Sequence, residues 1–288
     1  MGFFSNLFSK QSCVFCGKEV GALSRKKMHD GNYICKECEK KCSAFIEPSR
    51  FDTEYIKQHM EYMKKQDILY KKEFETLEKE KRARYVHEGY YGLEFADDIA
   101  MFEVIDPKAN KKNFKELFRY DQIKDYEVYA KPNTATGEGQ KKYSEVGIKI
   151  KMNCKIGLNA VEKTPAHPYV EELIILCARN TDISTDSTWA IEHLNKIFGR
   201  ASGTVFGSIK ESFIGTEHER QGYKAGADAL KAFGSLAKAK FTGNEEDAEK
   251  AKAKMDQAVE SGFAYSSENR SKYTQIANEA ERRAWGEE

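Results

Sequence analysis

Two Cys-x-x-Cys pairs near the start of the chain constrain its fold more than any other feature. The pairs are Cys13 with Cys16 and Cys35 with Cys38, and eighteen residues separate Cys16 from Cys35. This spacing is typical of two pairs that close one tetrahedral zinc site. The alternative, a redox pair beside unrelated thiols, fits the two-pair spacing less well. We therefore predict that these four cysteines bind a structural zinc ion.

The residues between the pairs predict a small zinc-dependent fold. Gly17 directly follows the first pair and supplies the backbone freedom that a tight metal-binding turn requires. Asp30 and Gly31 are a turn signal, residues 32–34 resemble a short strand, and the segment EKKCSAF after the second pair is typical of a helix. This order predicts a treble-clef or zinc-ribbon domain. Because so short a segment buries little core, metal binding should supply most of its folding free energy.

Two further residues that could bind a metal, Cys42 and His29, lie close to the pairs. Cys42 follows Cys38 by about one helical turn, and His29 precedes the predicted turn. Four thiolates already complete the coordination shell of a structural zinc ion. We therefore predict that Cys42 is a buried thiol and that His29 is a turn residue.

A closed four-thiolate site favours structure over catalysis because no coordination position remains for water or substrate. Elsewhere, His193 and Asp186 are the members of a conceivable catalytic triad, but the sequence has no G-x-S-x-G elbow to supply its serine. We therefore predict a non-enzymatic binding or scaffold protein with a protein partner.

A basic segment inside the cysteine region raises an alternative function. Arg25, Lys26 and Lys27 are consecutive, and such a turn is a candidate contact for an anion or a nucleic acid. The whole chain carries 47 Lys and Arg against 46 Asp and Glu, so it has no bulk attraction to a phosphate backbone. A nucleic-acid-binding regulator would therefore have to rely on this local segment.

The cysteine region also resembles a known family. The segment CVFCGKEVGALSRKKMHDGNYICKEC is similar to the N-terminal domain of largely uncharacterised bacterial and phage proteins. These proteins begin with a short Met-Gly-hydrophobic segment, carry CxxCGK and DGxxxCxxC, and often continue into a domain similar to pleckstrin-homology or GRAM modules. The resemblance covers about the first 45 residues. It implies zinc and an architecture, and it implies no reaction.

A long helix is predicted after this region. From Asp52 to about Arg84 the chain has no proline or glycine, and apolar residues recur at roughly helical intervals among many Glu and Lys residues. Because the apolar stripe is thin, we expect a solvated connector or an antiparallel coiled-coil arm.

Strands are predicted next, followed by one helix. In the segment VGIKIKM, Val146, Ile148, Ile150 and Met152 alternate with Gly and Lys, which predicts one buried and one solvated face. The helix predicted around STDSTWAIEHLNKIFGR should bury its apolar residues, Trp189 included. This order is typical of a pleckstrin-homology-like β-sandwich with a capping helix.

Lysines of this region have two interpretations. Lys149 and Lys151 on the solvated face, with Lys141 and Lys142 before them, could meet an anionic headgroup or could protect an edge strand from aggregation. Cys154 and Cys177 fall in predicted strands and should be buried.

The two ends of the chain complete the prediction. Residues 1–10, MGFFSNLFSK, form a short amphipathic segment that could contact a membrane surface, which would make the protein a peripheral membrane adaptor. The final third is rich in alanine and predicts three helices in a tail or bundle. No apolar run long enough to span a membrane and no secretory signal are found, so we expect a cytoplasmic protein.

Together these features predict a modular α+β protein. Its parts are the N-terminal segment 1–10, a zinc domain over 11–48, a helical connector over 49–86, a pleckstrin-homology-like β domain over 87–202 and a helical tail over 203–288.

Overall fold

The computed structural model describes most of the first two thirds of the chain and one helix at its end. The described residues are 10–107, 114–134, 139, 141–155, 164–182, 185–198, 250 and 267–286. The N-terminal amphipathic segment, apart from Lys10, lies outside them, as do most of the predicted helices of the tail.

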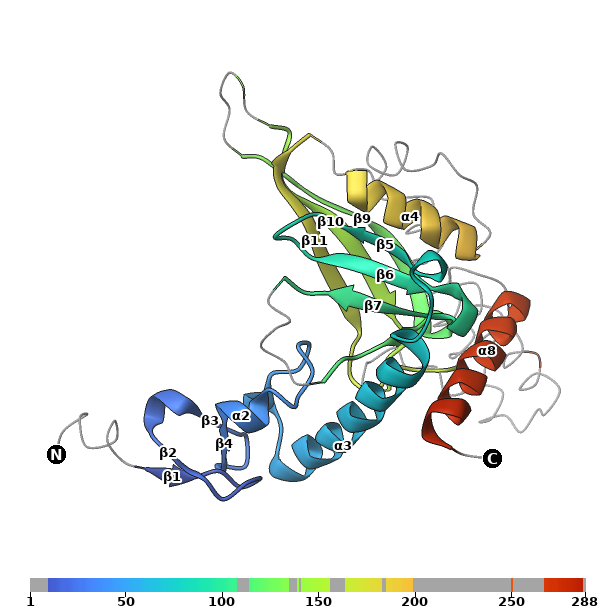
Figure 1. Cartoon of the computed structure of the whole chain (residues 1–288). Helices are drawn as coiled ribbons and strands as arrows, with labels where there is room; N and C mark the ends of the chain where they lie inside the picture. The colour runs from blue at the N-terminus through green and yellow to red at the C-terminus, as the bar shows by residue number, and fades with distance from the viewer. Residues whose placement is uncertain are drawn as a thin grey trace.

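The four-cysteine region forms a small module of two short hairpins and one helical turn (Figure 1). Its elements are β1 (Gln11–Ser12), β2 (Glu19–Val20), β3 (Arg25–Lys27), β4 (Tyr33–Cys35) and α2 (Lys36–Glu39). Strand β1 pairs with β2 and β3 pairs with β4, both antiparallel. This order agrees with the predicted metal-binding turn, the predicted strand before the second cysteine pair and the helix after it. The treble-clef or zinc-ribbon assignment itself stays a prediction.

Helix α3 (Thr53–Leu69) is shorter than the predicted helix, and one of its faces is buried in the protein. Asp52 caps its first turn by accepting a hydrogen bond from the Tyr55 N–H at 2.8 Å. The helix continues only through a π-helical turn, Tyr70–Phe74, in which Phe74 is buried. Residues 83–86 then pair in a sheet, so tertiary strand pairing overrides the helical tendency of this charged segment.

Polar side chains explain why the apolar stripe of α3 looked thin. His59, Gln66 and Asp67 are buried on the helix beside the apolar residues. Gln66 Oε1 accepts the Leu117 N–H at 3.1 Å, and Asp67 Oδ1 accepts the Lys115 N–H at 3.3 Å. The connector therefore holds a loop of the following domain through side-chain acceptors, which a hydrophobic pattern does not reveal.

Two antiparallel sheets, drawn above α3 in Figure 1, enclose the main apolar core. The four-stranded sheet runs in chain order through β5 (Ala83–Val86), β6 (Gly92–Ala96), β7 (Met101–Ile105) and β8 (Phe118–Arg119). The three-stranded sheet consists of β9 (Ile123–Pro132), β10 (Tyr143–Met152) and β11 (Glu172–Thr181), with β10 in the centre. Side chains of both sheets and of α4 (Thr185–Phe198) share one hydrophobic cluster.

The alternation predicted in β10 is confirmed. Val146, Ile148, Ile150 and Met152 are buried, whereas the intervening lysines are partly exposed. Gly147 is required at a β-bulge because a Cβ atom there would lie 2.0 Å from the Ile175 carbonyl oxygen. The order of four strands, three strands and a helix agrees with the predicted domain, and its pleckstrin-homology-like identity stays a prediction.

Helix α4 is amphipathic as predicted, with one exception. Ile191, Leu194, Ile197 and Phe198 are buried, but Trp189 is 61% exposed. The prediction that Trp189 belongs to the buried face is therefore wrong, because the buried face begins at Ala190 and Trp189 lies outside it.

The C-terminal helix α8 (Ser267–Trp285) packs on α3 and on the sheet region (Figure 1). Its small residues Ala277, Ala280 and Ala284 are fully buried, which permits close approach. Tyr273 OH donates to the Ile197 carbonyl at 2.7 Å, and Trp285 Nε1 donates to the Lys65 carbonyl at 3.1 Å. This helix is therefore part of the folded body and not a separate tail.

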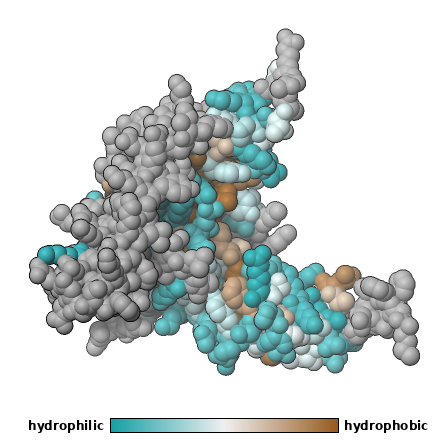
Figure 2. All heavy atoms as spheres, turned by 180° about the vertical axis from the view of Figure 1, so that it is seen from behind, coloured by the Kyte–Doolittle hydropathy of each residue, from teal (hydrophilic) through white to brown (hydrophobic). Residues whose placement is uncertain are grey.

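The described surface is mostly hydrophilic on the side shown in Figure 2. Exposed large apolar side chains are spread over the module, the residues after it, α3, β11 and α4. They are Val14, Leu23, Phe45, Ile68, Ile174 and Trp189. In the part of the chain that the structure describes, no helix is long and apolar enough to span a bilayer.

Candidate metal centre

The structure brings the four predicted cysteines together at the centre of the N-terminal module. The Sγ atoms of Cys13, Cys16, Cys35 and Cys38 all lie within 4.8 Å of one another. The Sγ atoms of Cys16 and Cys35 are 3.8 Å apart. A tetrahedral ion with metal–sulfur bonds of about 2.3 Å requires sulfur–sulfur distances of about 3.8 Å, so a zinc ion fits between these donors.

Local backbone geometry positions each pair. In the first turn Gly17 has φ of +71°, and its N–H donates to the Cys13 carbonyl at 2.8 Å. In the second turn Cys35 is the N-cap of α2, and its Sγ accepts the Cys38 N–H at 3.4 Å. The Cys35 N–H donates to Cys13 Sγ at 3.4 Å and so links the two pairs. These N–H groups point partial positive charge at the sulfurs, which stabilises thiolates.

The environment of the sulfurs is mostly dry. Cys13 is 1% exposed, Cys35 and Cys38 are also buried, and Cys16 lies at the surface. Burial acts to raise the pKa of the Cys13 thiol, but the N–H groups of Cys35, Phe15 and Cys16 outweigh it and lower that pKa to about 7. Burial raises the pKa values of Cys35 and Cys38, and hydrogen bonds with the Cys13 and Cys16 thiols add to the rise. Four adjacent thiolates therefore require a cation to be stable together.

The two nearby candidates do not join the cluster. Cys42 is buried in the apolar core of the module, as predicted. His29 is exposed, and its backbone N–H donates to the Phe51 carbonyl at 3.0 Å. Among the described residues, the metal-ligand group consists of the four cysteines.

The basic segment is a strand and not the turn that we expected. Lys26 pairs with Glu39 at 2.6 Å and with Glu47 at 3.1 Å. Arg25 lies over the ring of Tyr33, with 4.8 Å from Cζ to the ring centroid, and Lys27 is exposed. The pairing of β3 with β4 places these side chains against the module, so two of the three charges are already engaged within the protein.

The module is fastened to α3 by the turn between β3 and β4. Asp30 Oδ2 accepts the Thr53 hydroxyl at 2.5 Å and the Thr53 N–H at 2.9 Å. The hydrogen bonds from Thr53 lower the pKa of Asp30 to about 2. Ile56 and Met60 of α3 belong to the same apolar cluster as the cysteines. The first half of α3 is therefore packed as part of the cysteine module.

The lysines of the sheet region are also engaged. Lys149 lies 2.8 Å from Glu172 on β11 and 4.0 Å from Glu127 on β9, and Lys141 pairs with Asp182 at 2.9 Å. Because β10 is the central strand of its sheet, the interpretation of Lys149 as an edge-strand lysine is wrong. Lys149 instead forms cross-strand ion pairs with Glu172 and Glu127.

His193 has partners other than those of the rejected triad. Its Nε2 lies 3.0 Å from Asp97 Oδ1, its Nδ1 lies 3.2 Å from the Tyr85 hydroxyl, and its ring stacks on Phe95 at 4.4 Å. Both ring nitrogens are thus engaged in contacts that join α4 to the four-stranded sheet. We therefore interpret His193 as a residue that packs α4 against the sheet.

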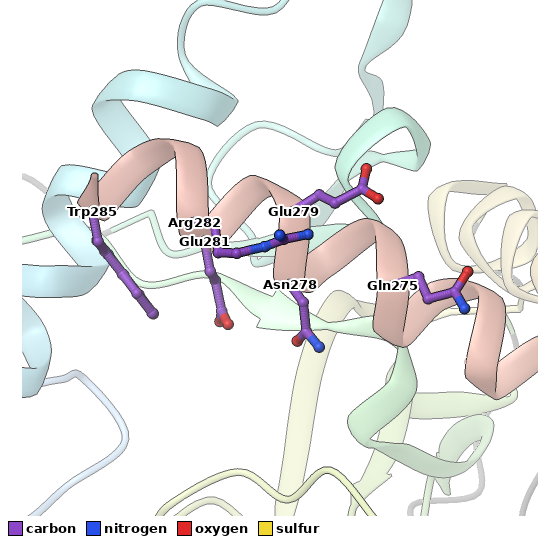
Figure 3. Close-up of a pocket in the computed structure, with 6 residues that line it drawn as sticks. All are labelled: Gln275, Asn278, Glu279, Glu281, Arg282 and Trp285. Atoms are coloured by element: carbon purple, nitrogen blue, oxygen red, sulfur yellow. The ribbon is translucent and has the colours of Figure 1, made fainter. Parts of the chain in front are cut away.

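A surface hollow lies along α8 (Figure 3). Its lining residues come from one face of this helix and are mostly polar. They are Gln275, Asn278, Glu279, Glu281, Arg282 and Trp285. Glu281 is already paired with Arg119 at 2.7 Å, so we assign no chemistry to this hollow.

Sequence reasoning missed a buried polar cluster around Glu116. Ser43, His167 and Tyr169 surround its carboxylate although they are far from it in the chain. No spacing or motif connects these residues, so only the fold could reveal the cluster.

Comparison with known families gives a match at the cysteine module. Residues 11–65 match a family described as Domain of unknown function (DUF4428). The matched span contains the four cysteines and continues into α3, in agreement with the contacts of Asp30 and Ile56. The match and the cysteine cluster together fit an N-terminal zinc-binding domain. No curated protein and no solved structure matches the chain.

Proposed function

We propose that the protein is a non-enzymatic binding or scaffold protein whose N-terminal module folds around a structural zinc ion. The observation that carries the proposal is the cluster of four Sγ atoms within 4.8 Å. The ligands would be Cys13, Cys16, Cys35 and Cys38. Bound zinc would hold the two cysteine turns together and balance the charge of their thiolates.

The donor set supports a structural role for the metal. Four thiolates complete the tetrahedral shell that zinc prefers, so no position is left to bind and activate a water molecule. Three of the four sulfurs are buried within the module, where exchange for another ligand would expose its core.

The arrangement of the body supports a scaffold role. The module and the first half of α3 form one small core, and Leu69 at the end of α3 joins the main core together with Phe74 of the π-helical turn that follows. The antiparallel sheets with α4 have the element order of pleckstrin-homology-like domains, which bind proteins or lipids through their surfaces in many different ways. We propose that the partner is another protein.

Metal analysis of the purified full-length chain tests the zinc proposal. We expect one zinc ion per chain, lost together with thermal stability in Cys13→Ser and Cys35→Ser. Cys177→Ala is the matched control because Cys177 is a buried cysteine outside the cluster. It should keep full metal content. Zinc-free wild-type protein, or full metal content in both cluster variants, would contradict the proposal.

A salt titration tests the scaffold proposal against nucleic-acid binding. Because Lys26 is neutralised by two carboxylates, we expect no salt-dependent affinity for duplex or single-stranded probes. Affinity that falls steeply with salt and is reduced in Lys27→Ala would instead support a nucleic-acid-binding regulator.

A further inference from the structure

A carboxylate is buried where the module, α3 and the sheets meet. Glu116 precedes β8, and its side chain is 6% exposed. Its Oε2 accepts a hydrogen bond from Ser43 Oγ at 2.5 Å, and its Oε1 accepts one from the Tyr169 hydroxyl. His167 Nε2 lies 3.5 Å from the same Oε1. Because a buried carboxylate is costly unless it is paired, these partners are what make its position tolerable.

The orientation of His167 adds electrostatic support. Its Nδ1 accepts the Val170 N–H at 3.0 Å, which places the ring proton on Nε2, facing Glu116. The distance of 3.5 Å is long for a hydrogen bond, so the attraction is mainly between charges and dipoles. Burial acts to raise the pKa of Glu116, but His167 and the two hydroxyl donors outweigh it and lower that pKa.

Aromatic rings enclose this group of residues. The ring of Tyr169 meets His59 edge-on at 4.7 Å and Tyr62 edge-on at 5.9 Å, measured between centroids. The ring of His167 stacks on Phe118 at 5.2 Å. These rings keep the surroundings apolar, which strengthens each polar contact and makes a broken one expensive.

Ser43 connects this carboxylate to the cysteine site. It lies five residues after Cys38, and the turn between them is fixed by the Lys41 N–H bonding to the Cys38 carbonyl at 3.0 Å. The Ser43 N–H then donates to His59 Nε2 on α3 at 3.0 Å. Cys35 caps α2 and Cys38 lies within it, so this helix and the turn after it join the cysteine cluster to Ser43.

We propose that Ser43, Glu116, His167 and Tyr169 form a metal-dependent latch. Metal at the four cysteines holds Ser43 against Glu116 and thereby fixes the module to the sheets. Loss of the metal frees Ser43, leaves the carboxylate under-paired and opens the junction to water. Metal supply would thus decide whether the module and the sheets act as one rigid unit. This inference rests on the proposed zinc binding.

Linkage makes the latch measurable from both sides. If metal binding stabilises the latch by a given factor, an intact latch must increase metal affinity by the same factor. Glu116→Gln keeps the size of the side chain but removes its charge, so it should weaken the latch and with it the metal. We expect about tenfold weaker zinc binding, which corresponds to about 1.4 kcal/mol.

The first experiment uses the wild-type full chain. After metal content is measured, hydrogen exchange is compared between the zinc-loaded and the chelator-treated protein. If the latch exists, the backbone amides of residues 114–118 should exchange faster when zinc is removed. Residues 146–151 of β10 are the internal control, because they pair with β9 and β11 and not with the module.

The second experiment measures zinc affinity by competition with a chromogenic chelator. Glu116→Gln is compared with Glu61→Gln, whose side chain on α3 is 63% exposed and pairs with Lys64 on the same helix. We expect a change of about tenfold for the first variant and less than about twofold for the second, since exposed ion pairs contribute little.

The outcomes separate the two proposals. A zinc-loaded protein whose residues 114–118 exchange equally with and without metal would overturn the latch but leave the zinc proposal intact. Equal zinc affinity of both Glu variants would also overturn it. A wild-type protein that binds no zinc would overturn both. If Glu116→Gln does not fold, the exchange comparison on the wild type still decides.

Discussion

Truncation of Ile56 on α3 should weaken zinc binding although this residue touches no metal. Ile56 is 0% exposed and belongs to the apolar cluster that contains Cys13, Cys35 and Cys38. Replacing a fully buried Ile by Ala costs about 2 to 5 kcal/mol, because apolar burial is lost and a cavity remains. We take about 3 kcal/mol as the loss for Ile56→Ala.

The loss of stability in Ile56→Ala should appear as weaker zinc binding. A module this small has little core of its own, so its folding and metal binding are one equilibrium. Since each 1.4 kcal/mol is a factor of ten, a loss of about 3 kcal/mol raises the zinc dissociation constant roughly 150-fold. Competition with a chromogenic chelator at neutral pH measures that constant directly.

Ile68→Ala is the matched control on the same helix. Ile68 is 42% exposed, so its truncation should cost less than about 1 kcal/mol and change zinc affinity less than about fivefold. Equal zinc affinity of the two variants would refute the reasoning that α3 is part of the module. It would also mean that the module folds around the metal without the helix.

Two other predictions test the contacts that fix the module and α8. Asp30→Asn should lower the melting temperature at pH 7, because the ionised Asp30 accepts two hydrogen bonds from Thr53. Since the folded-state pKa of about 2 lies below the ordinary 3.8, this stabilisation is present above pH 3.8 and is lost as the pH falls through 2. The melting temperatures of wild type and variant should therefore converge over that range, and a constant difference would contradict the assignment. Arg119→Ala should destabilise the protein by about 3 to 5 kcal/mol in urea unfolding, because it leaves the fully buried Asp121 without its cation and removes the bond to Glu281. A loss below about 1 kcal/mol would show that this pair is no more than a surface contact.

Features that depend on nearby residues could be predicted from the sequence. The cysteine site is set by two short turns and one hairpin, so spacing alone predicts its four ligands. The alternation of Val146, Ile148 and Ile150 records which face of β10 is buried, and the apolar periodicity before Phe198 predicts α4. In each case the signal and the structure lie within one stretch of chain.

Features that depend on tertiary contacts could not be predicted. The predicted helix reached Arg84, whereas residues 83–86 pair with β6 as a strand, which no helix propensity reveals. Its buried face includes Gln66 and Asp67, which read as solvent-facing in a hydrophobic pattern. The sequence gives no sign that Lys26 is paired, because Glu39 and Glu47 come close to it only in the folded protein.

The cluster around Glu116 is the clearest case of this limit. Its members come from the end of the module, the segment before β8 and the segment before β11. A buried carboxylate has no sequence signature of its own, because Glu residues are mostly exposed. The fold therefore adds a connection between metal site and sheets that the sequence did not indicate.

X-ray absorption at the zinc edge of the purified full-length protein tests the central claim most directly. The account predicts one zinc ion per chain with four sulfur ligands at about 2.3 Å and no nitrogen or oxygen in the first shell. Absence of zinc would contradict it. A shell that includes a water or histidine ligand would also contradict it, because the metal would then not be bound by the four cysteines alone.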